Sequence, residues 1–466
     1  MGKEIVPVMV EKQLEEARQW ESEVFQQVCI AGQRKASEYL GLLEESLFAQ
    51  RPRGWRVVGF RERTLVTRFG EVRLRRRLYQ DRLGEYHFLL DEYLGLNASQ
   101  AATPEMQAMC TILCGEISFR KAADFLEQWM TGLLSHSTCW QLLQRTGEAA
   151  AEVRDEEVEA VFSRGEPIAQ VGERTVDRLY MEADGVYVRL QRQPQTHLEL
   201  CSAIAYEGWE RLCGAREGYR LREKQVYCHV GQRISFWEGA SLAWAHKWDL
   251  RQVREVIIGG DGAAWIRSGV DTFARAVWQL DGFHLARACR QAFGAQAGRE
   301  LYQRLRTGAA TKMQASLSQT PLREGKQAQR ASRWIEKLAQ QKWGLDWRVR
   351  QGATLEDARG LGCMEGNQAQ LLAARMKGKG RSWSPDGAYH MAKVQELLTN
   401  GEVQRWCYRQ KRVEKPPARF TRHPRSSLIA PDQWLQAPIP AFHGPSPNAP
   451  WVLYLRLLIH PKRLLN

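Results

Sequence analysis

The chain has 466 residues, 44% of them hydrophobic, and a formal net charge of +14 at pH 7. Its length allows about two to four domains with buried cores, and it contains no apolar run of about 18 residues that would predict a membrane span. The N-terminal segment is too charged for a secretory signal and lacks the Ser or Thr that N-myristoylation needs. We therefore expect a cytoplasmic protein without a membrane partner.

The first hundred residues predict a helical segment followed by a small β region. Residues 10–50 place apolar and charged side chains at helical spacing, so we assign an N-terminal helical segment to 1–50. Within 51–95, TLVTRFGEVRLRRRLYQ alternates apolar with basic residues and turns at Gly70, which predicts a β-hairpin. The arginines on its polar face could follow phosphates or simply face solvent. They are Arg73, Arg75, Arg76 and Arg77.

Residues 96–165 predict a helical DNA-binding region. A helix is expected over 118–130 with Ser118 as its N-cap, then a turn at TGLLS, then a second helix from Ser137 to about Ala150. Two helices joined in this way resemble a helix-turn-helix, although plain helical hairpins have the same pattern. The second helix would read bases through its polar positions. These are Gln141, Gln144 and Arg145.

From Asp177 onward, strand and helix patterns alternate in the order β-β-β-α-β-α-β-α. This is the order of the ribonuclease H-like fold, an α/β core with a mixed five-stranded sheet, and we assign it to residues 175–410 with an all-α insertion at about 287–360. Right-handed crossovers would place the first and fourth strands side by side. The expected strands are 179–191, 199–206, 224–230, 255–258 and 276–280, and the expected helices are 235–253, 263–275 and 284 onward.

Three carboxylates lie at informative places in this order. Asp184 lies on the first strand, Asp261 follows the fourth, and Glu365 precedes a basic helical segment. Converging carboxylates repel one another unless they hold a cation, and hard oxygen ligands suit Mg²⁺ or Mn²⁺. A single Asp at a strand end is more often a cap or turn residue. Glu182 shares a strand face with Asp184 and is the main rival for the first ligand.

Other chemistry-bearing groups accompany these acids. Asp281 and His284 follow the last strand and could support the site, face phosphate or be purely structural. After Glu365, cations, glycines and a tryptophan suit backbone contacts and base stacking, with a charged surface loop as the alternative. These residues are Arg375, Lys377, Lys379, Arg381 and Trp383.

The cysteines and the C-terminal tail carry weaker signals. Cys110, Cys114 and Cys139 could form a zinc site, but buried reduced thiols are the expectation. Residues 366–466 contain 16 Lys and Arg against 5 Asp and Glu, an excess that favours a polyanionic partner. The same excess would fit a solvated tail, and residues 411–466 are basic and Pro-rich, so we expect them to be extended or disordered.

Taken together, several strings resemble bacterial insertion-sequence transposases of the DDE type, in the ISLre-two family. The strings are LLDEYLGL, ISFRKAADFL, DGVYVRLQ, YEGWE, GDGAAWI, LDGFHLARA and EGNQAQLLAARMKGKGRSWSPDGA. The resemblance spans about residues 55–401 and implies a ribonuclease H-like catalytic domain with Asp184, Asp261 and Glu365 as its metal-binding triad. It also implies an upstream DNA-binding region and a helical insertion between the second and third acids.

The activity implied is metal-dependent cleavage at element ends and strand transfer into target DNA, using Mg²⁺ or Mn²⁺. The partners implied are double-stranded DNA and further copies of the chain, in a bacterial, nucleoid-associated setting. Two alternatives stay open at this point. One is a catalytically inactive or repurposed DNA-binding protein, and the other is a ribonuclease H-like nuclease or resolvase that cuts without joining.

Overall fold

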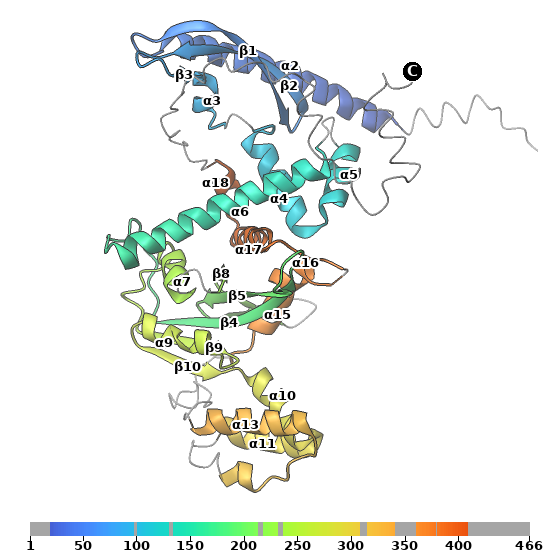
Figure 1. Cartoon of the computed structure of the whole chain (residues 1–466), viewed down its shortest axis with the longest axis vertical. Coiled ribbons are helices and arrows are strands. Elements are labelled where there is room, and N and C mark those ends of the chain that lie inside the picture. Colours follow the sequence, from blue (N-terminus) through green and yellow to red (C-terminus); the bar gives the residue numbers. More distant parts are fainter. Residues whose placement is uncertain are drawn as a thin grey trace, which may run out of the picture. The chain divides into compact units, whose positions relative to one another are not determined.

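The computed structural model describes residues 19–96, 100–129, 134–212, 218–231, 236–307, 315–340, 360–378 and 380–408. Figure 1 gives the labels of the helices and strands. The tail predicted for 411–466 and the predicted DNA contact Lys379 lie outside the described residues. All described residues belong to one compact unit, Met1–Arg412.

The N-terminal part pairs a long helix with a β-hairpin, as the sequence predicts. Its elements are α2 (Trp20–Ala49), β1 (Arg56–Thr67), β2 (Gly70–Gln80), β3 (Tyr86–His87) and α3 (Leu89–Tyr93). Gly70 has a φ of +105°, which a turn tolerates best with glycine. Leu65 and Leu74 of the hairpin share a small core with Leu90.

The arginine row on this hairpin is only partly exposed. Arg76 forms an ion pair with Asp91, and Arg77 Nη2 lies 2.6 Å from Glu45 Oε1; each arginine side chain is 11% exposed. Arg73 and Arg75 remain exposed. Half of the row that could have followed phosphates is therefore used in internal ion pairs.

A group of helices follows the hairpin. Its members are α4 (Pro104–Glu116), α5 (Phe119–Trp129), α6 (His136–Val158), the π-helix η1 (Glu159–Ser163), α17 (Pro385–Asn400) and α18 (Val403–Tyr408). Ser118 Oγ accepts a hydrogen bond from Lys121 N at 3.3 Å, so the predicted cap at the start of α5 is confirmed.

Helix α6 is longer than predicted because α17 covers much of its length. A Cβ at Gly147 would lie 2.3 Å from the carbonyl oxygen of His390, so glycine permits this close approach. In Figure 1, α17 lies between α6 and the sheet. The helix that was predicted to read DNA is thus also a central packing element.

The predicted mixed five-stranded sheet is present. Its strands are β4 (Arg178–Arg189), β5 (His197–Tyr206), β8 (Gln225–Val230), β9 (Glu255–Gly260) and β10 (Ala276–Leu280). Their order is β10-β9-β4-β5-β8. β4, β5 and β8 pair antiparallel, whereas β4, β9 and β10 pair parallel. Glu182 of β4 lies opposite Gly259 of β9, so the first and fourth strands are neighbours as predicted.

Helices cover both faces of this sheet. Met181 and Ala183 of β4 pack in one hydrophobic cluster with α7 (Phe236–Ala245). Tyr180 and Val186, which alternate with them, pack in a second cluster with residues of α4, α6 and α17. The sheet is therefore buried between two apolar layers.

Two details differ from the sequence-based prediction. In the chain, a hairpin of β6 (Trp209–Leu212) and β7 (Gly218–Leu221) is inserted between β5 and β8, which still pair with each other in the sheet. The helix expected over 263–275 is divided into α8 (Ala264–Arg267) and α9 (Gly269–Thr272). A Cβ at Gly269 would lie 2.6 Å from the Trp237 ring, so the indole occupies the space beside this break.

The described part of the predicted insertion is helical. It contains most of α10 (Gly282–Phe293), then α11 (Ala295–Thr307) and α13 (Lys326–Gln340), while 308–314 and 341–359 lie outside the described residues. Leu301 and Ile335 join the main hydrophobic cluster. The domain boundaries predicted from the sequence stay predictions.

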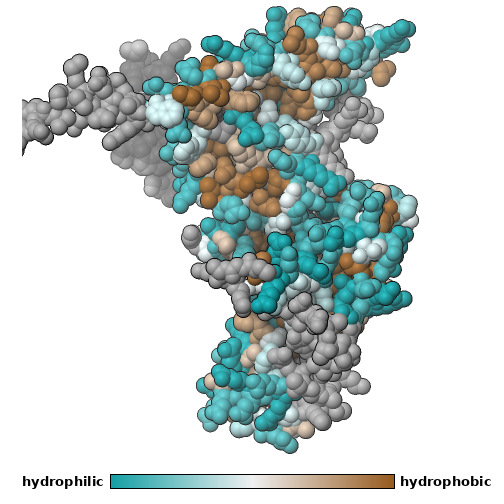
Figure 2. Space-filling model, turned by 180° about the vertical axis from the view of Figure 1, so that it is seen from behind, coloured by the Kyte–Doolittle hydropathy of each residue, from teal (hydrophilic) through white to brown (hydrophobic). Residues whose placement is uncertain are grey.

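The surface of the described residues is mixed in character. Figure 2 shows brown apolar patches within a largely teal surface. Large apolar side chains are exposed on α2, among them Trp20, Phe25 and Leu42. Among the described residues, no helix combines the length and the apolar character needed to cross a membrane.

Candidate active site

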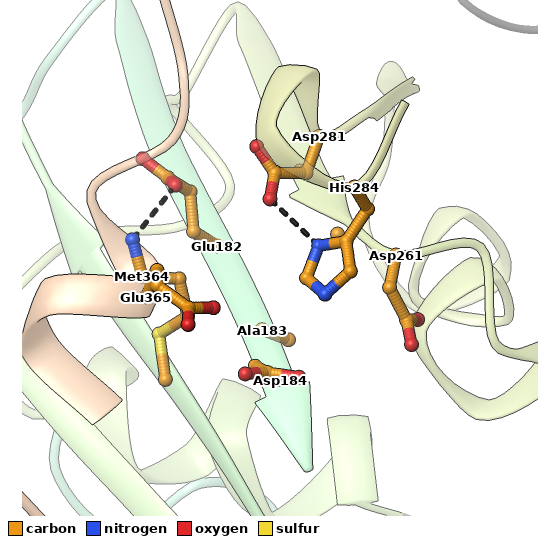
Figure 3. A pocket seen from close by; sticks show the side chains of 10 residues that line it. Glu182, Ala183, Asp184, Asp261, Asp281, His284, Met364 and Glu365 are labelled. Carbon is orange, nitrogen blue, oxygen red and sulfur yellow. Dashed lines mark hydrogen bonds and ion pairs between the residues drawn. The ribbon is translucent and has the colours of Figure 1, made fainter. Parts of the chain in front are cut away.

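The structure brings Asp184, Asp261 and Glu365 to the lining of one small pocket (Figure 3). Asp184 lies on β4, Asp261 directly follows β9, and Glu365 lies in the first turn of α15 (Met364–Gln368). The parallel pairing of β4 with β9 explains why the first two acids are close, because Asp184 and Asp261 each follow the last paired residues, Glu182 and Gly259, by two positions. The pocket is also lined by Glu182, Ala183, Gly259, Gly260, Asp281, His284 and Met364.

Asp184 is half-buried and electrostatically linked to the other acids. Burial raises the pKa of Asp184 to about 6, and the charges of Asp261 and Glu365 act in the same direction. The amide N–H of Gly185, 2.8 Å from Oδ1, and the charge of His284 act against this rise. A carboxylate placed in this way is stabilised by an additional positive charge.

Asp261 is held by the loop that it begins. Its Oδ1 accepts a hydrogen bond from Ala263 N at 2.8 Å. The two glycines before it allow close packing, because a Cβ at Gly259 would lie 2.8 Å from Leu361 and one at Gly260 would lie 2.6 Å from Ile266. The Gly-Gly-Asp string therefore brings the end of β9 close to the segment that carries Glu365.

Glu182 anchors the segment that leads to Glu365. Its side chain is buried, and Oε2 accepts hydrogen bonds from Gly362 N at 2.8 Å and from Met364 N at 3.1 Å. Oε1 accepts the hydroxyl of Tyr206 at 2.5 Å. Burial raises the pKa of Glu182 despite these hydrogen bonds. The sequence marked this residue as a rival ligand, but its two oxygens are used to hold protein groups.

The helix that carries Glu365 continues past its first turn. α15 leads without a break into the π-helix η2 (Ala369–Ala373) and then α16 (Ala374–Met376). Gln368 accepts a hydrogen bond from the hydroxyl of Ser202, which fixes α15 against β5. π-Turns inside α-helices occur often at functional sites. The exposed Glu365 side chain thus projects from a helix whose buried side is attached to the sheet.

Asp281 and His284 form a pair beside the three acids. Asp281 is the N-cap of α10 and accepts a hydrogen bond from Phe283 N at 3.0 Å, while its Oδ2 lies 2.8 Å from His284 Nδ1. The hydrogen bond to Asp281 raises the pKa of His284 against the opposing effect of burial, and the charges of Asp184 and Asp261 raise it further. In Figure 3 the imidazole ring lies between Asp281 and the other two aspartates.

Two of the residues predicted to contact DNA after Glu365 have buried side chains. Arg375 is 5% exposed, donates from Nε to the Cys114 carbonyl at 2.9 Å, and lies over the rings of Phe119 and Trp383. Trp383 is 8% exposed and donates from Nε1 to the Met376 carbonyl at 3.0 Å. The polar groups of both side chains are therefore used in internal hydrogen bonds.

The two described basic residues between them are more accessible. Lys377 is exposed, and Arg381 is partly exposed. Arg381 donates from Nη1 to the Ala374 carbonyl at 2.8 Å, so it also satisfies the end of α16. Lys377 is therefore the clearer candidate for a phosphate contact.

The residues of α6 that were predicted to read bases also differ in exposure. Gln141 is exposed, and Arg145 is partly buried. Gln144 was predicted to be exposed, but it is 9% exposed and its Oε1 lies 2.9 Å from His390 Nδ1. The prediction failed because α17 packs on that face of α6, which a local helical pattern does not reveal.

The three discounted cysteines lie together. Cys110 Sγ is 3.9 Å from Cys114 Sγ, and both are buried with Cys139 in a core of apolar side chains. Their ligand atoms lie within 4.8 Å of one another, but this set contains no fourth His, Cys, Asp or Glu among the described residues. Structural zinc sites use four ligands, so buried thiols remain the interpretation.

The fold and the site define an α/β protein with a carboxylate-lined pocket where β9 ends beside β4 in a mixed sheet. The chain belongs to the Uncharacterised protein family UPF0236, whose family model matches residues 13–413. It is similar to the UPF0236 protein in the vanSb 3′ region of Streptococcus gallolyticus, with 26% identity over 75% of each chain.

Further relatives come from Caldanaerobacter subterraneus subsp. tengcongensis. One UPF0236 protein of this organism is 23% identical over 76% of this chain and 71% of its own length, and its name joins eleven locus designations. Among solved structures, the Drosophila P element transposase strand transfer complex matches 63% of this chain and 78% of that chain at 10% identity. The TM-score of 0.23 is too low to support an inference from this likeness.

Proposed function

We propose that this protein is the DDE transposase of an insertion sequence, which cleaves DNA at the element ends and joins them to target DNA. The observation that carries the proposal is the meeting of Asp184, Asp261 and Glu365 in one pocket. Asp184 lies on β4, Asp261 follows β9, and Glu365 lies on α15. The five-stranded sheet that contains β4 and β9 has the strand order β10-β9-β4-β5-β8. This is the order expected for a ribonuclease H-like catalytic domain, and we assign that fold to the core.

The donor set of the pocket fits Mg²⁺ or Mn²⁺. It consists of carboxylate oxygens, the ligands that hard divalent cations prefer. Asp184, Asp261 and Glu365 would hold the cations, and a positive charge there would offset the burial and the repulsion from the other two acids that raise the pKa of Asp184. When bound, such cations lower the pKa of an attacking water or 3′-hydroxyl and stabilise the leaving 3′-oxygen.

The remaining residues would position these groups. Glu182 holds the backbone directly before Glu365, so it fixes the third acid relative to β4. Asp281 orients His284 through Nδ1, which keeps the ring beside the acids. A protonated His284 would supply a positive charge to the phosphate oxygens of the substrate.

The distribution of relatives gives independent support. The names of two UPF0236 proteins of C. subterraneus join eleven and four locus designations respectively. A protein encoded at many places in one genome is what a gene that moves and copies itself would leave. We extend this expectation to the present chain.

The proposed partners are the DNA of the element ends and the target. A net charge of +14 favours association with a polyanion, and the exposed Lys377 lies on the segment that follows Glu365. Assembly of several copies on DNA is part of the proposal.

A cleavage and joining assay tests the proposal against its alternatives. The DNA that flanks the gene should contain imperfect inverted repeats and a short target duplication, and labelled duplexes carrying those repeats would serve as substrates. A transposase releases a 3′ end and joins it to a target plasmid. A nuclease or resolvase of the same fold would cut without joining, and a repurposed DNA-binding protein would bind without cutting.

A further inference from the structure

A second hollow adjoins the acid pocket and shares two of its residues. Asp261 and His284 line both, and the second hollow continues between α10 and α13, with a volume of about 440 Å³. Arg287 of α10 and Arg330 of α13 line it from the two helices. Two guanidinium groups therefore line the hollow that adjoins the acids.

The two arginines are available to a ligand. Both are exposed, and within the described residues neither has a hydrogen-bond or ion-pair partner. This contrasts with Arg76 and Arg77 of the hairpin, whose guanidinium groups are used in ion pairs. Guanidinium groups that have no partner among the described residues, beside a site for cation-assisted chemistry, suit the phosphates of a polyanion.

An aromatic ring completes the hollow. Trp334 lies one turn after Arg330 on α13, is partly buried against the main hydrophobic cluster, and lines the hollow with its remaining surface. Gln291 of α10 lines the same space. Cations combined with an aromatic ring and amide side chains are the usual components of a single-strand binding groove, in which bases stack on the ring.

We propose that this hollow, which we call the α10–α13 groove, holds a single strand of DNA next to the scissile phosphate. Arg287 and Arg330 contact the strand's phosphates, and a base stacks on Trp334. A volume of about 440 Å³ is in the range of small-ligand pockets and suits a short stretch of one strand. The identity of the strand as an unpaired element end rests on the proposed function.

This assignment requires a particular structure of the DNA substrate. The end of the element must be locally unpaired for one strand to enter the α10–α13 groove while the acids act on the adjoining phosphate. Unpairing a few bases costs free energy, which stacking on an aromatic ring offsets in part. The groove would therefore favour DNA with an unpaired end over blunt duplex.

Binding of labelled oligothymidylate, of blunt duplex and of duplex with a single-stranded 3′ overhang tests the proposal. The full-length protein is used with Ca²⁺ in place of Mg²⁺, so that binding is measured without cleavage. The groove variant is Arg287→Ala/Arg330→Ala. The matched control is Arg290→Ala/Arg333→Ala, which removes equal charge from the exposed side of the same two helices, outside the groove lining.

The groove variant should bind oligothymidylate and overhang DNA on the order of tenfold more weakly, and its salt slope should fall by about 1.4, for two single-strand contacts at about 0.7 each. The control should bind all three DNAs as the wild type does. Trp334→Leu, which keeps an apolar side chain against the core, should weaken overhang binding on the order of tenfold, and Trp334→Phe should weaken it less.

Equal binding of single strands by the groove variant and the wild type would overturn the proposal, as would an equal loss in the control variant. The test also separates this proposal from the proposed function. Overhang binding through the groove by a protein that never cleaves with Mg²⁺ or Mn²⁺ would leave the groove standing and remove the transposase activity. Conversely, normal cleavage by the wild type together with unchanged single-strand binding by the groove variant would support the transposase activity and overturn the assignment of the groove.

Discussion

The buried carboxylate of Glu182 accepts a hydrogen bond from the amide N–H of Met364 at 3.1 Å, although 182 positions separate the two residues in the chain. Glu182 lies two residues before Asp184, and Met364 lies directly before Glu365. Together with the hydrogen bond from Gly362 N to the same oxygen, this contact ties the first and third acids of the candidate site to one another. The site depends on it because α15 has no side-chain cap of its own at Cys363.

Replacing Glu182 by Gln should impair cleavage less than replacing any of the three acids. The amide keeps one acceptor oxygen, so it cannot accept from both the Tyr206 hydroxyl and the backbone of Gly362 and Met364. We expect a roughly tenfold to hundredfold lower rate and a need for more Mn²⁺, because Glu365 is less well placed. The measurement is the cleavage rate against Mn²⁺ concentration.

Tyr206→Phe is the control, since it removes only the hydroxyl. Complete loss of activity in a folded Glu182→Gln protein would make Glu182 a metal ligand instead.

Asp281 and His284 should act as a unit. Because Asp281 works by orienting His284 through a 2.8 Å contact, removing either side chain removes most of the effect of both. We expect His284→Ala and Asp281→Asn each to lower the cleavage rate by about 10- to 100-fold, and the double variant to be little worse than either. Single-turnover cleavage by the four proteins measures this coupling. Strictly additive losses would show that the two side chains act separately.

The structure also predicts that neighbouring basic residues differ in role. Arg375→Ala should lower the free energy of unfolding by about 2–4 kcal/mol, because it leaves the Cys114 carbonyl without its donor and empties space between two rings. Lys377→Ala should leave stability within about 0.5 kcal/mol and reduce the salt slope of DNA binding by about 0.9. Urea denaturation and DNA titration at several salt concentrations measure the two effects. The assignment fails if Arg375→Ala is as stable as the wild type.

Acid stability should depend on Glu157 of α6. Burial raises the pKa of Glu157, but hydrogen bonds from His246 and Arg154 and their charges outweigh it and lower the pKa to about 2. Because the folded-state pKa lies below the unfolded value, the stabilisation is complete at neutral pH and is lost as pH falls from about 4 toward 2. Glu157→Gln should therefore be less stable at pH 7 and should lose less stability over that pH range.

The control for this prediction is Glu156→Gln. Glu156 is the adjacent residue, and its ion pair with Arg164 is on the surface, with the carboxylate side chain 60% exposed. Its replacement should change the free energy of unfolding by less than about 1 kcal/mol. Parallel acid-unfolding curves for the wild type and Glu157→Gln would contradict the account.

Much of the sheet could be predicted from the sequence because its signals are local. The apolar runs of β4, β5, β8, β9 and β10 mark strands, and the two glycines that end β9 mark its end, without reference to distant residues. The handedness rule then placed β4 beside β9, and with them Asp184 beside Asp261. The position of Glu365 in the same pocket could not follow from such a rule, and it was expected from the family resemblance.

The roles of single polar residues were harder to predict because they depend on partners far along the chain. Arg375 is a residue type that often contacts phosphates, but its Nε–H donates to the carbonyl of Cys114, which is 261 positions away in the chain. Gln144 lies on the face of α6 that the local sequence pattern predicts to be polar and exposed, but α17 covers this face and His390 contacts Gln144. Glu182 has the sequence setting of a ligand, and only the positions of Gly362 and Met364 identify it as an anchor.

Metal-dependent cleavage of the element's own ends tests the central claim most directly. The wild type should cut them with Mg²⁺ or Mn²⁺ and should bind without cutting in Ca²⁺, whose looser coordination fits the chemistry poorly. Asp184→Asn, Asp261→Asn and Glu365→Gln should each abolish cleavage while DNA affinity stays within about twofold of the wild type. Substantial cleavage by any one variant would remove that residue from the triad, and a wild-type protein that binds these ends but never cuts them with either metal would contradict the account.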